Sequence, residues 1–167
     1  IENITAILLF TYNLLLFSMN FINKIISTFF YVGFLPKLPG TFGTLAGAIF
    51  YYYINYFFNP TSMEMLFITI LIIFISISTS NYAINIFKSK DPVFVVIDEV
   101  AGIFVAMLFL PFSIVNLIIA FLLFRLFDVW KPWFVGDFEK MPGGLGITMD
   151  DVGAGIMANA LIQIMIY

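Results

Sequence analysis

Long apolar segments, separated by short stretches of Gly, Pro, Asn and charged residues, cover almost the whole chain of 167 residues. Apolar segments with such breakers between them predict helices, and we expect six. Their approximate bounds are Ile4 to Phe30, Thr44 to Phe58, Glu64 to Phe87, two arms within Val100 to Phe127, and Asp150 to Tyr167. The run from Met65 to Phe87 carries no charge and is long enough to cross a hydrocarbon core of ~30 Å. The pattern therefore predicts an all-α, polytopic membrane bundle.

The connections between these helices differ in polarity. A loop rich in Gly and Pro is expected from Gly33 to Gly43, and a connection with polar edges from Lys88 to Val96. Asn and Lys side chains make the end of the first helix amphipathic, so both a spanning and an interfacial arrangement fit it. The N-terminus has no basic stretch, so we expect no cleavable signal peptide.

The segment from Val100 to Phe127 has two interpretations. A single span kinked at Pro111 would place Asp98 and Asp128 roughly 40 Å apart, at 1.5 Å per residue. A short helical hairpin turning near Pro111 has arms of similar length and brings the charged groups level. With the hairpin, all basic residues fall on one side, which the positive-inside rule identifies as the cytoplasmic side. They are Lys24, Lys37, Lys88, Lys90, Arg125, Lys131 and Lys140. We therefore expect the hairpin.

Composition narrows the class of protein. The chain is 62% hydrophobic with 22 Phe, and its 10 acidic and 7 basic residues give a net charge of −3. No linker, charge run or repeat divides it, so we expect a single membrane-embedded domain over residues 1–167, without nucleic acid as a partner. The absence of Cys and His excludes disulfides, Cys- or His-ligated zinc, and Cys- or His-phosphate intermediates. Carboxylates, Lys, Arg, hydroxyl groups, backbone amides and a hard cation remain for catalysis.

Two adjacent acids, Asp98 and Glu99, stand at the predicted start of a helix in an otherwise apolar stretch. A charge near hydrocarbon is costly and usually serves a function. A structural alternative is an N-terminal charge pair stabilised by the helix dipole, typically by under ~1 kcal/mol. Two acids in so apolar a setting favour metal binding.

Arg125, Asp128 and Lys131 recur every third residue and share one face of a helix. Arg and Lys suit phosphate oxygens, Arg through a bidentate fork and Lys as a point charge. The structural alternative is a ladder of salt bridges within the helix. Pro132 is expected to end this helix just after Lys131.

Two segments with glycines lead into predicted helices, where backbone amides can hold an anion. In the first, the candidate phosphate-binding residues are Lys37, Pro39, Gly40, Thr41 and Thr44. The second contains the glycines Gly143 and Gly144 and the paired acids Asp150 and Asp151. Paired acids at a helix start attract a divalent cation, while the structural alternative is a flexible turn with an N-cap.

Four motifs together resemble the phosphatidylglycerophosphatase A family, in that family's order and spacing. They are Lys37-Leu-Pro-Gly-Thr-Phe-Gly-Thr44, Ile97-Asp-Glu-Val-Ala-Gly102, Phe124-Arg-Leu-Phe-Asp-Val-Trp-Lys-Pro132 and Gly143-Gly-Leu-Gly-Ile-Thr-Met-Asp-Asp151. The resemblance covers the chain from about Gly33 to the C-terminus. It implies a magnesium-dependent membrane phosphatase of phospholipid biosynthesis that converts phosphatidylglycerophosphate to phosphatidylglycerol and phosphate. It also implies a bacterial inner membrane location, with the site facing the cytoplasm.

The resemblance assigns roles position by position. The implied magnesium ligands are Asp98, Glu99, Asp128, Asp150 and Asp151. The implied catalytic groups are Asp98, Asp128, Lys131 and Asp150, and Arg125, Lys131, Gly143 and Gly144 join the first loop in binding substrate. Five carboxylates exceed what one ion needs, so some of them hold a second ion, act as general base or pair with Arg125 and Lys131. Direct attack by water and an aspartyl-phosphate on Asp128 or Asp150 both stay open.

Two rival functions rank lower. A CDP-alcohol-type membrane phosphotransferase would carry an Asp-Gly-x-x-Ala-Arg pattern, which this sequence lacks. A transporter or channel needs polar groups along a path through the membrane midplane, commonly with repeated halves. Only a few hydroxyl side chains, from Ser76 to Ser80, stand near mid-depth, and no repeat is visible. The oligomeric state is open.

Overall fold

The structure is a computed structural model that describes residues 16–132, 135–138 and 140–166. Every regular element in these residues is a helix, which confirms the all-α class. A first helix, whose described part covers residues 16–27, comes before the others. The elements that follow are η1 (Val32–Phe34), α2 (Pro39–Phe58), α3 (Ser62–Phe87), α4 (Ile97–Ala106), α5 (Ile114–Trp130), α6 (Val135–Phe138) and α7 (Gly144–Ile166). The predicted start of the first helix, at Ile4, lies outside the described residues.

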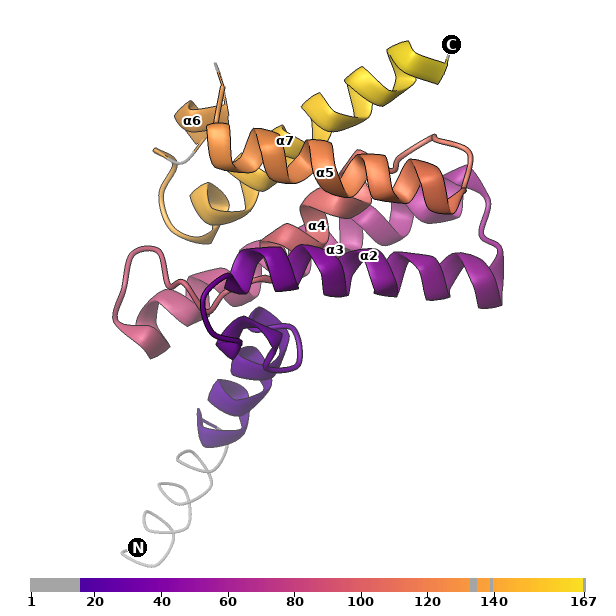
Figure 1. The fold of residues 1–167 in the computed structure, drawn as a ribbon. Coiled ribbons are helices and arrows are strands. Elements are labelled where there is room, and N and C mark those ends of the chain that lie inside the picture. The colour runs from indigo at the N-terminus through magenta and orange to yellow at the C-terminus, as the bar shows by residue number, and fades with distance from the viewer. Residues whose placement is uncertain (1–15, 133–134, 139, 167) are drawn as a thin grey trace, which may run out of the picture.

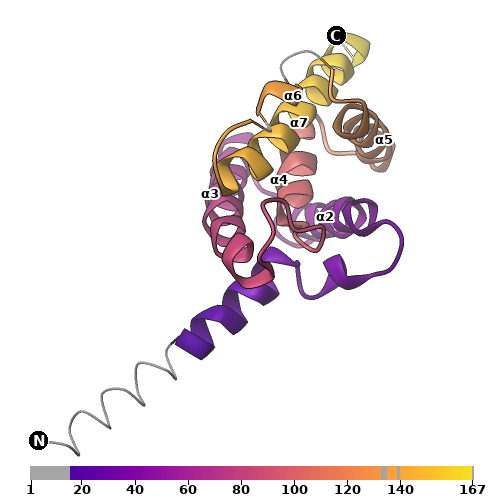
Figure 2. The same cartoon turned by 90° about the vertical axis from the view of Figure 1, so that its left-hand side faces the viewer.

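Helix α4 forms the centre of the bundle (Figure 2). Its residues beyond Glu99 are apolar or small, and all of them are buried. Helices α2, α3, α5 and α7 all pack against it. Small residues bring the backbones close together, because a Cβ on Gly155 of α7 would collide with the carbonyl oxygen of Gly102 in α4. A short buried helix therefore organises the four longer ones around it.

The chain reverses between α4 and α5, as the hairpin interpretation predicts. α4 ends at Ala106, and α5 begins at Ile114, after seven intervening residues, and packs back against α4. Asn159 of α7 donates hydrogen bonds from Nδ2 to the carbonyl oxygens of Ala106 (3.0 Å) and Leu108 (2.8 Å). Carbonyls at a helix C-terminus lack partners within the helix, so Asn159 stabilises the reversal. The helix thus ends before Pro111, at a place that contacts from α7 fix.

Helix α2 begins earlier than the sequence suggests. The expected start was Thr44, but the helix starts at Pro39. Proline suits the first position of a helix because its φ is already helical and its missing N–H would have no partner there. The loop expected from Gly33 to Gly43 therefore ends at Leu38, and part of it is the short helix η1.

Helix α7 also begins earlier, at Gly144 rather than Asp150. The N–H of Gly144 donates to Oδ1 of Asn81 in α3 at 2.7 Å, so a side chain from another helix supplies the partner at this end. Asp150 and Asp151 consequently lie in the second turn of α7 and not at its start. The short helix α6 between α5 and α7 was not predicted.

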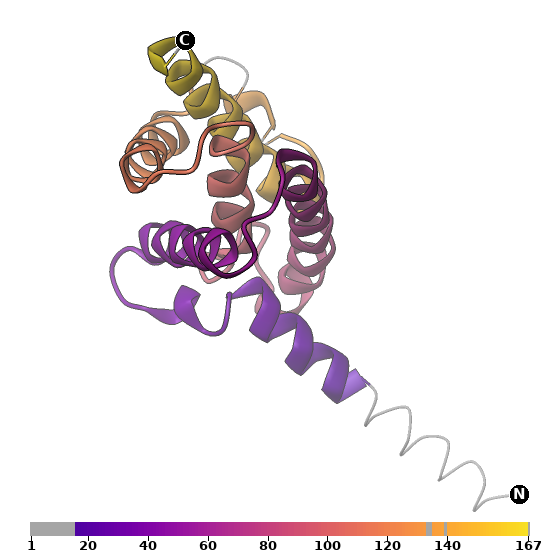
Figure 3. The same cartoon turned by 90° about the vertical axis from the view of Figure 1, so that its right-hand side faces the viewer.

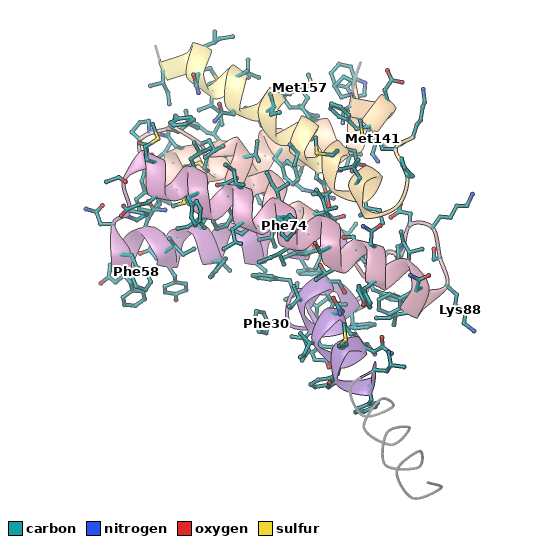
Figure 4. The ribbon with its side chains drawn as sticks, turned by 180° about the vertical axis from the view of Figure 1, so that it is seen from behind. Phe30, Phe58, Phe74, Lys88, Met141 and Met157 are labelled. Carbon is teal, nitrogen blue, oxygen red and sulfur yellow. The ribbon has the colours of Figure 1, made fainter. Side chains whose placement is uncertain are left out.

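The charged helix ends meet at one end of the bundle. The N-termini of α2, α4 and α7 and the C-termini of α3 and α5 lie together at the left of Figure 1. Lys88 and Met141 lie at this end and Phe58 at the opposite one (Figure 4). The hairpin at α4 and α5 thus brings the scarce charges of the sequence level with one another.

Large apolar side chains cover much of the outer surface. Phe67 and Phe74 of α3 are 71% and 69% exposed, and Ile164 of α7 is 78% exposed (Figure 4). Within the described part of the chain, two helices, α3 and α7, are long and apolar enough to cross a bilayer. The helical class is established by these elements, and a membrane bundle of about six helices stays a prediction.

Candidate metal and phosphate site

A cavity of about 830 Å³ opens at the charged end of the bundle. It is lined by residues from α2, α3, α4, α5 and α7 and from the segments between them. The sequence-predicted residues that line it are Pro39, Gly40, Asp98, Glu99, Arg125, Asp128, Lys131, Gly143, Asp150 and Asp151. Three groups that are far apart in the sequence therefore share one cavity. Its rim adds Lys90 and Lys140, which the sequence did not single out for the site.

Three carboxylates gather at the inner end of the charged groups, and we call them the acidic trio: Asp98 and Glu99 of α4 and Asp151 of α7. One oxygen from each lies within 4.8 Å of the others. Oε2 of Glu99 and Oδ1 of Asp151 are buried and have no hydrogen-bond partner among the described residues. A buried carboxylate without a partner is costly, and a cation removes that cost. Oxygen ligands of this kind suit a hard divalent ion such as Mg²⁺.

Burial also changes the acidity of the two acids in α4. It raises the pKa of Asp98 to about 6. Burial first, and then the charge of Asp98, raise the pKa of Glu99 well above its usual range. Both effects disfavour the ionised forms in the absence of a counter-charge. A bound cation would favour ionisation of both, so these two acids could serve as metal ligands.

The other two acids are paired with bases. Arg125 and Asp128 of α5 form an ion pair one helical turn apart, which is the ladder that the sequence offered as an alternative. Nζ of Lys131 donates to Oδ2 of Asp150 at 2.7 Å and so links the end of α5 to α7. The helix ends at Trp130, one residue earlier than expected, and Lys131 has a positive φ of 46°. This left-handed conformation directs the chain away from the α5 axis at the residue that contacts α7.

Close packing of α7 on α4 sets the position of Asp151. A Cβ on Gly102 would collide with the ring of Phe124 and would lie 3.1 Å from the carbonyl oxygen of Asp151. Gly102 thus lets α5 and α7 both approach α4 one turn beyond Asp98. Asn81 contributes from α3 by capping α7. Neither Gly102 nor Asn81 was predicted to shape the site. For Asn81, the sequence feature that could have indicated this role is a polar amide side chain within a long apolar helix.

Some residues of the first predicted loop line the cavity, and another packs within helix α2. Pro39 and Gly40 line the cavity, whereas Lys37, Thr41 and Thr44 do not. Thr44 is fully buried, and its hydroxyl donates to the carbonyl oxygen of Gly40 at 2.9 Å. In the second loop, Gly143 lines the cavity, while the N–H of Gly144 is already bonded to Asn81. The amide of Gly144 is therefore engaged within the protein, where the sequence suggested an anion.

Gly40 is the point at which α2 approaches the charged groups most closely, and replacing it by Ala should disturb them. A Cβ there would collide with Oε1 of Glu99 and would lie 3.2 Å from Nη1 of Arg125. The carboxylate is the far end of a flexible side chain, so we expect it to move without unfolding the bundle. For Gly40→Ala we predict that the phosphate release implied by the sequence resemblance falls about 10- to 100-fold, with little change in melting temperature.

The matched control for this change is Gly136→Ala. Among the described residues, a Cβ at Gly136 would meet the carbonyl oxygen of Lys131 alone, at an ordinary contact distance of 3.5 Å. Turnover and melting temperature are to be measured for both variants in detergent. If Gly40→Ala kept full turnover, the close approach of α2 to Glu99 would have no bearing on the chemistry.

Comparison with known proteins supports the family that the four motifs resemble. The family described as Phosphatidylglycerophosphatase A matches residues 25–166. A Bacteroides thetaiotaomicron protein named "Putative phosphatidylinositol-3-phosphatase" is 35% identical over 87% of this chain and 94% of its own length. The Phosphatidylglycerophosphatase A of Escherichia coli is 31% identical over 78% of this chain and 75% of its own length, and that of Haemophilus influenzae is 30% identical over 78% and 80%. No solved structure matches the chain.

The family match extends over most of the chain and includes all four motifs that form the cavity. Two of the relatives carry the name that the motifs suggest. The chain belongs to the phosphatidylglycerophosphatase A family.

Proposed function

We propose that this protein is a magnesium-dependent lipid phosphatase that hydrolyses phosphatidylglycerophosphate to phosphatidylglycerol and inorganic phosphate. The observation that carries this proposal is the acidic trio, with its two unpartnered buried oxygens, directly beside two ion pairs that contain the cavity's Arg125 and Lys131. An enzyme that acts on a phosphate monoester needs cations that neutralise phosphate and groups that handle a proton. The cavity contains both the basic side chains and the carboxylates, and they belong to the motifs that resemble the family.

The acidic trio would hold magnesium, because its donor set is oxygen only and its free oxygens need a counter-charge. When bound there, magnesium would neutralise charge on the phosphate and help to orient water. The neighbouring Asp128 and Asp150 then do not have to be ligands, although the sequence resemblance assigned them that role. Each of them forms an ion pair instead, Asp128 with Arg125 and Asp150 with Lys131.

Arg125 and Lys131 would bind the oxygens of the substrate phosphate. Each is already held by a carboxylate, so phosphate would compete with Asp128 for the guanidinium and with Asp150 for the ammonium. A carboxylate released in this way becomes available to accept a proton from water or to attack phosphorus itself. Arg125 is the only arginine of the chain, and its fork matches phosphate better than the point charge of a lysine.

Two chemical routes fit this arrangement. In the first, water attacks phosphorus while Asp128 or Asp150 accepts its proton. In the second, one of these carboxylates attacks and an aspartyl-phosphate is hydrolysed afterwards. A single turnover that is quenched rapidly, followed by borohydride reduction, digestion and mass spectrometry, separates them. Reduction of an aspartyl-phosphate converts that Asp to homoserine, so homoserine at position 128 or 150 supports the second route, and its absence supports direct attack by water.

The protein would be an integral protein of the bacterial inner membrane, with its site at the cytoplasmic face. Exposed apolar side chains on α3 and α7 support contact with lipid, and the two helices have sufficient length to span. Lys88 lies at the charged end of the bundle, and Lys90, Arg125, Lys131 and Lys140 line the cavity there, which is the distribution typical of a cytoplasmic face. A lipid substrate would then present its headgroup to the cavity from the membrane surface.

The test is phosphate release by the purified protein in detergent. We expect release from phosphatidylglycerophosphate with magnesium and none when the metal is chelated. Phosphatidylinositol 3-phosphate is the second substrate to assay, because the name of the Bacteroides relative points to it. The substrate with the higher kcat/KM is the one that the site selects. Absence of release from both lipids, with and without magnesium, would defeat the phosphatase proposal in favour of a transporter or a phosphotransferase.

A further inference from the structure

A second, smaller cavity lies outside the charged site. It is a groove of about 210 Å³ between α2 and α5. Its lining is entirely apolar and consists of Leu45, Ala48 and Ile49 from α2 and Leu117, Ile118 and Phe121 from α5. Leu45, Ile49 and Ile118 are 46%, 49% and 54% exposed, so the groove is open to the surroundings of the protein. We call it the α2–α5 groove.

The groove lies on the same two helices, α2 and α5, that also contribute to the charged cavity. α2 and α5 run side by side in opposite directions, on the flank of α4 away from α3 (Figures 1 and 3). Gly40 and Arg125 line the charged cavity. Leu45 follows Gly40 by five residues, or ~7.5 Å along the helix, and Phe121 precedes Arg125 by four, or ~6 Å. One end of the groove therefore lies about one helical turn from the charged groups.

The shape and chemistry of the groove identify its occupant. Six apolar side chains offer no hydrogen bonds, so the groove favours an apolar occupant over water. A whole helix is about 10 Å across, so only its side chains could enter a groove of about 210 Å³. A single hydrocarbon chain is narrow and apolar throughout, and a lipid phosphomonoester joins such a chain to the charged headgroup that the neighbouring cavity would bind.

We propose that the α2–α5 groove holds one acyl chain of the lipid substrate. The inference rests on the proposed phosphatase function and adds a subsite to it. The chain would lie between the two helices, with its headgroup in the charged cavity that Gly40 and Arg125 help to line. The groove thus makes the enzyme selective for phosphomonoesters that carry an acyl chain over the same headgroup without one.

The test blocks the groove at an exposed position. Leu45→Trp places a larger side chain at the groove, and Leu122→Trp is the matched control, since Leu122 is 60% exposed on α5 but does not line the groove. Each variant is assayed on long-chain phosphatidylglycerophosphate and on the deacylated headgroup, glycerophosphoglycerophosphate. For Leu45→Trp we expect kcat/KM on the long-chain lipid to fall about tenfold, equivalent to losing the burial of roughly two methylene groups. Activity on the deacylated headgroup should not change, and Leu122→Trp should resemble the unmodified protein on both.

A binding measurement keeps the inference separate from turnover. Phosphatidylglycerophosphate with a diazirine on one acyl chain is photolysed with the protein in detergent, and labelled peptides are mapped by mass spectrometry. We expect label on α2 and α5 that Leu45→Trp diminishes. Label spread equally over the exposed faces of α3 and α7, or an unchanged preference for the long-chain lipid in Leu45→Trp, would overturn the groove assignment.

The remaining outcomes are also decisive. A change in oligomeric state with Leu45→Trp, measured by size-exclusion chromatography with light scattering, would identify the groove as a contact between two copies and not as an acyl site. If the unmodified protein released phosphate from neither lipid, the proposed function would fail. The labelling pattern would still decide whether the groove binds an acyl chain.

Discussion

Asp151→Asn is expected to lower phosphate release by at least ~10³-fold, because a metal contributes several kcal/mol to transition-state stabilisation and this change removes one of the three charged ligands proposed for it. The same substitution should raise the melting temperature of the magnesium-free protein. Asp151 is 4% exposed, and its Oδ1 has no partner among the described residues, so the ionised form is costly in the folded state. Opposite effects on turnover and stability are the expected signature of a metal ligand, and Asp98→Asn should behave in the same way.

The measurement is a pair of melting curves, with magnesium and with a chelator, together with turnover. Magnesium should raise the melting temperature of the unmodified protein and leave that of Asp151→Asn nearly unchanged. Asp137→Asn is the control, because Asp137 is exposed and its ion pair with Lys140 is exposed as well. If Asp151→Asn kept both its turnover and its stabilisation by magnesium, the acidic trio would be a structural feature and the metal would bind elsewhere.

Arg125→Lys is expected to lower kcat/KM by about 10²-fold or more, although the positive charge is kept. The guanidinium pairs with Asp128 and lies beside Gly40, where the Glu99 carboxylate of the acidic trio also lies. Its orientation is therefore fixed close to the trio. An ammonium at this position can make one directed contact with a phosphate but not the two parallel bonds of a guanidinium. The fold should survive, since Arg125 is half-buried and a lysine stem can follow the same path.

Phosphate release and inhibition by inorganic phosphate both report on this change. We expect the inhibition constant for phosphate to increase together with the loss of kcat/KM, because the same contact binds substrate and product. Lys88→Arg is the matched control, since Lys88 lies at the same end of the bundle and does not line the cavity. Unchanged phosphate inhibition in Arg125→Lys would remove Arg125 from the substrate site and leave it as the partner of Asp128.

Much of the site was visible in the chain because charge is so scarce in it. The sequence singled out Asp98-Glu99, Asp150-Asp151 and the group around Arg125, and all of them line one cavity. The hairpin near Pro111 could be chosen from arm lengths and charge topology, since these depend only on the order of residues. Helix starts at Pro39 and Gly144 were missed, because a proline that opens a helix looks like a loop residue and the cap on Gly144 comes from a different helix.

The sequence by itself determined the helical class, the membrane-like composition and the set of groups available for chemistry. Only the tertiary structure decided how five carboxylates divide. Three of them form the acidic trio, and Asp128 and Asp150 pair with bases. The physical reason is that a carboxylate's partner depends on how closely α7 and α5 approach α4. That approach is set by contacts at Gly102 and Gly155, which lie about one helical turn from the acids of their own helices but whose close contacts are with residues of other helices.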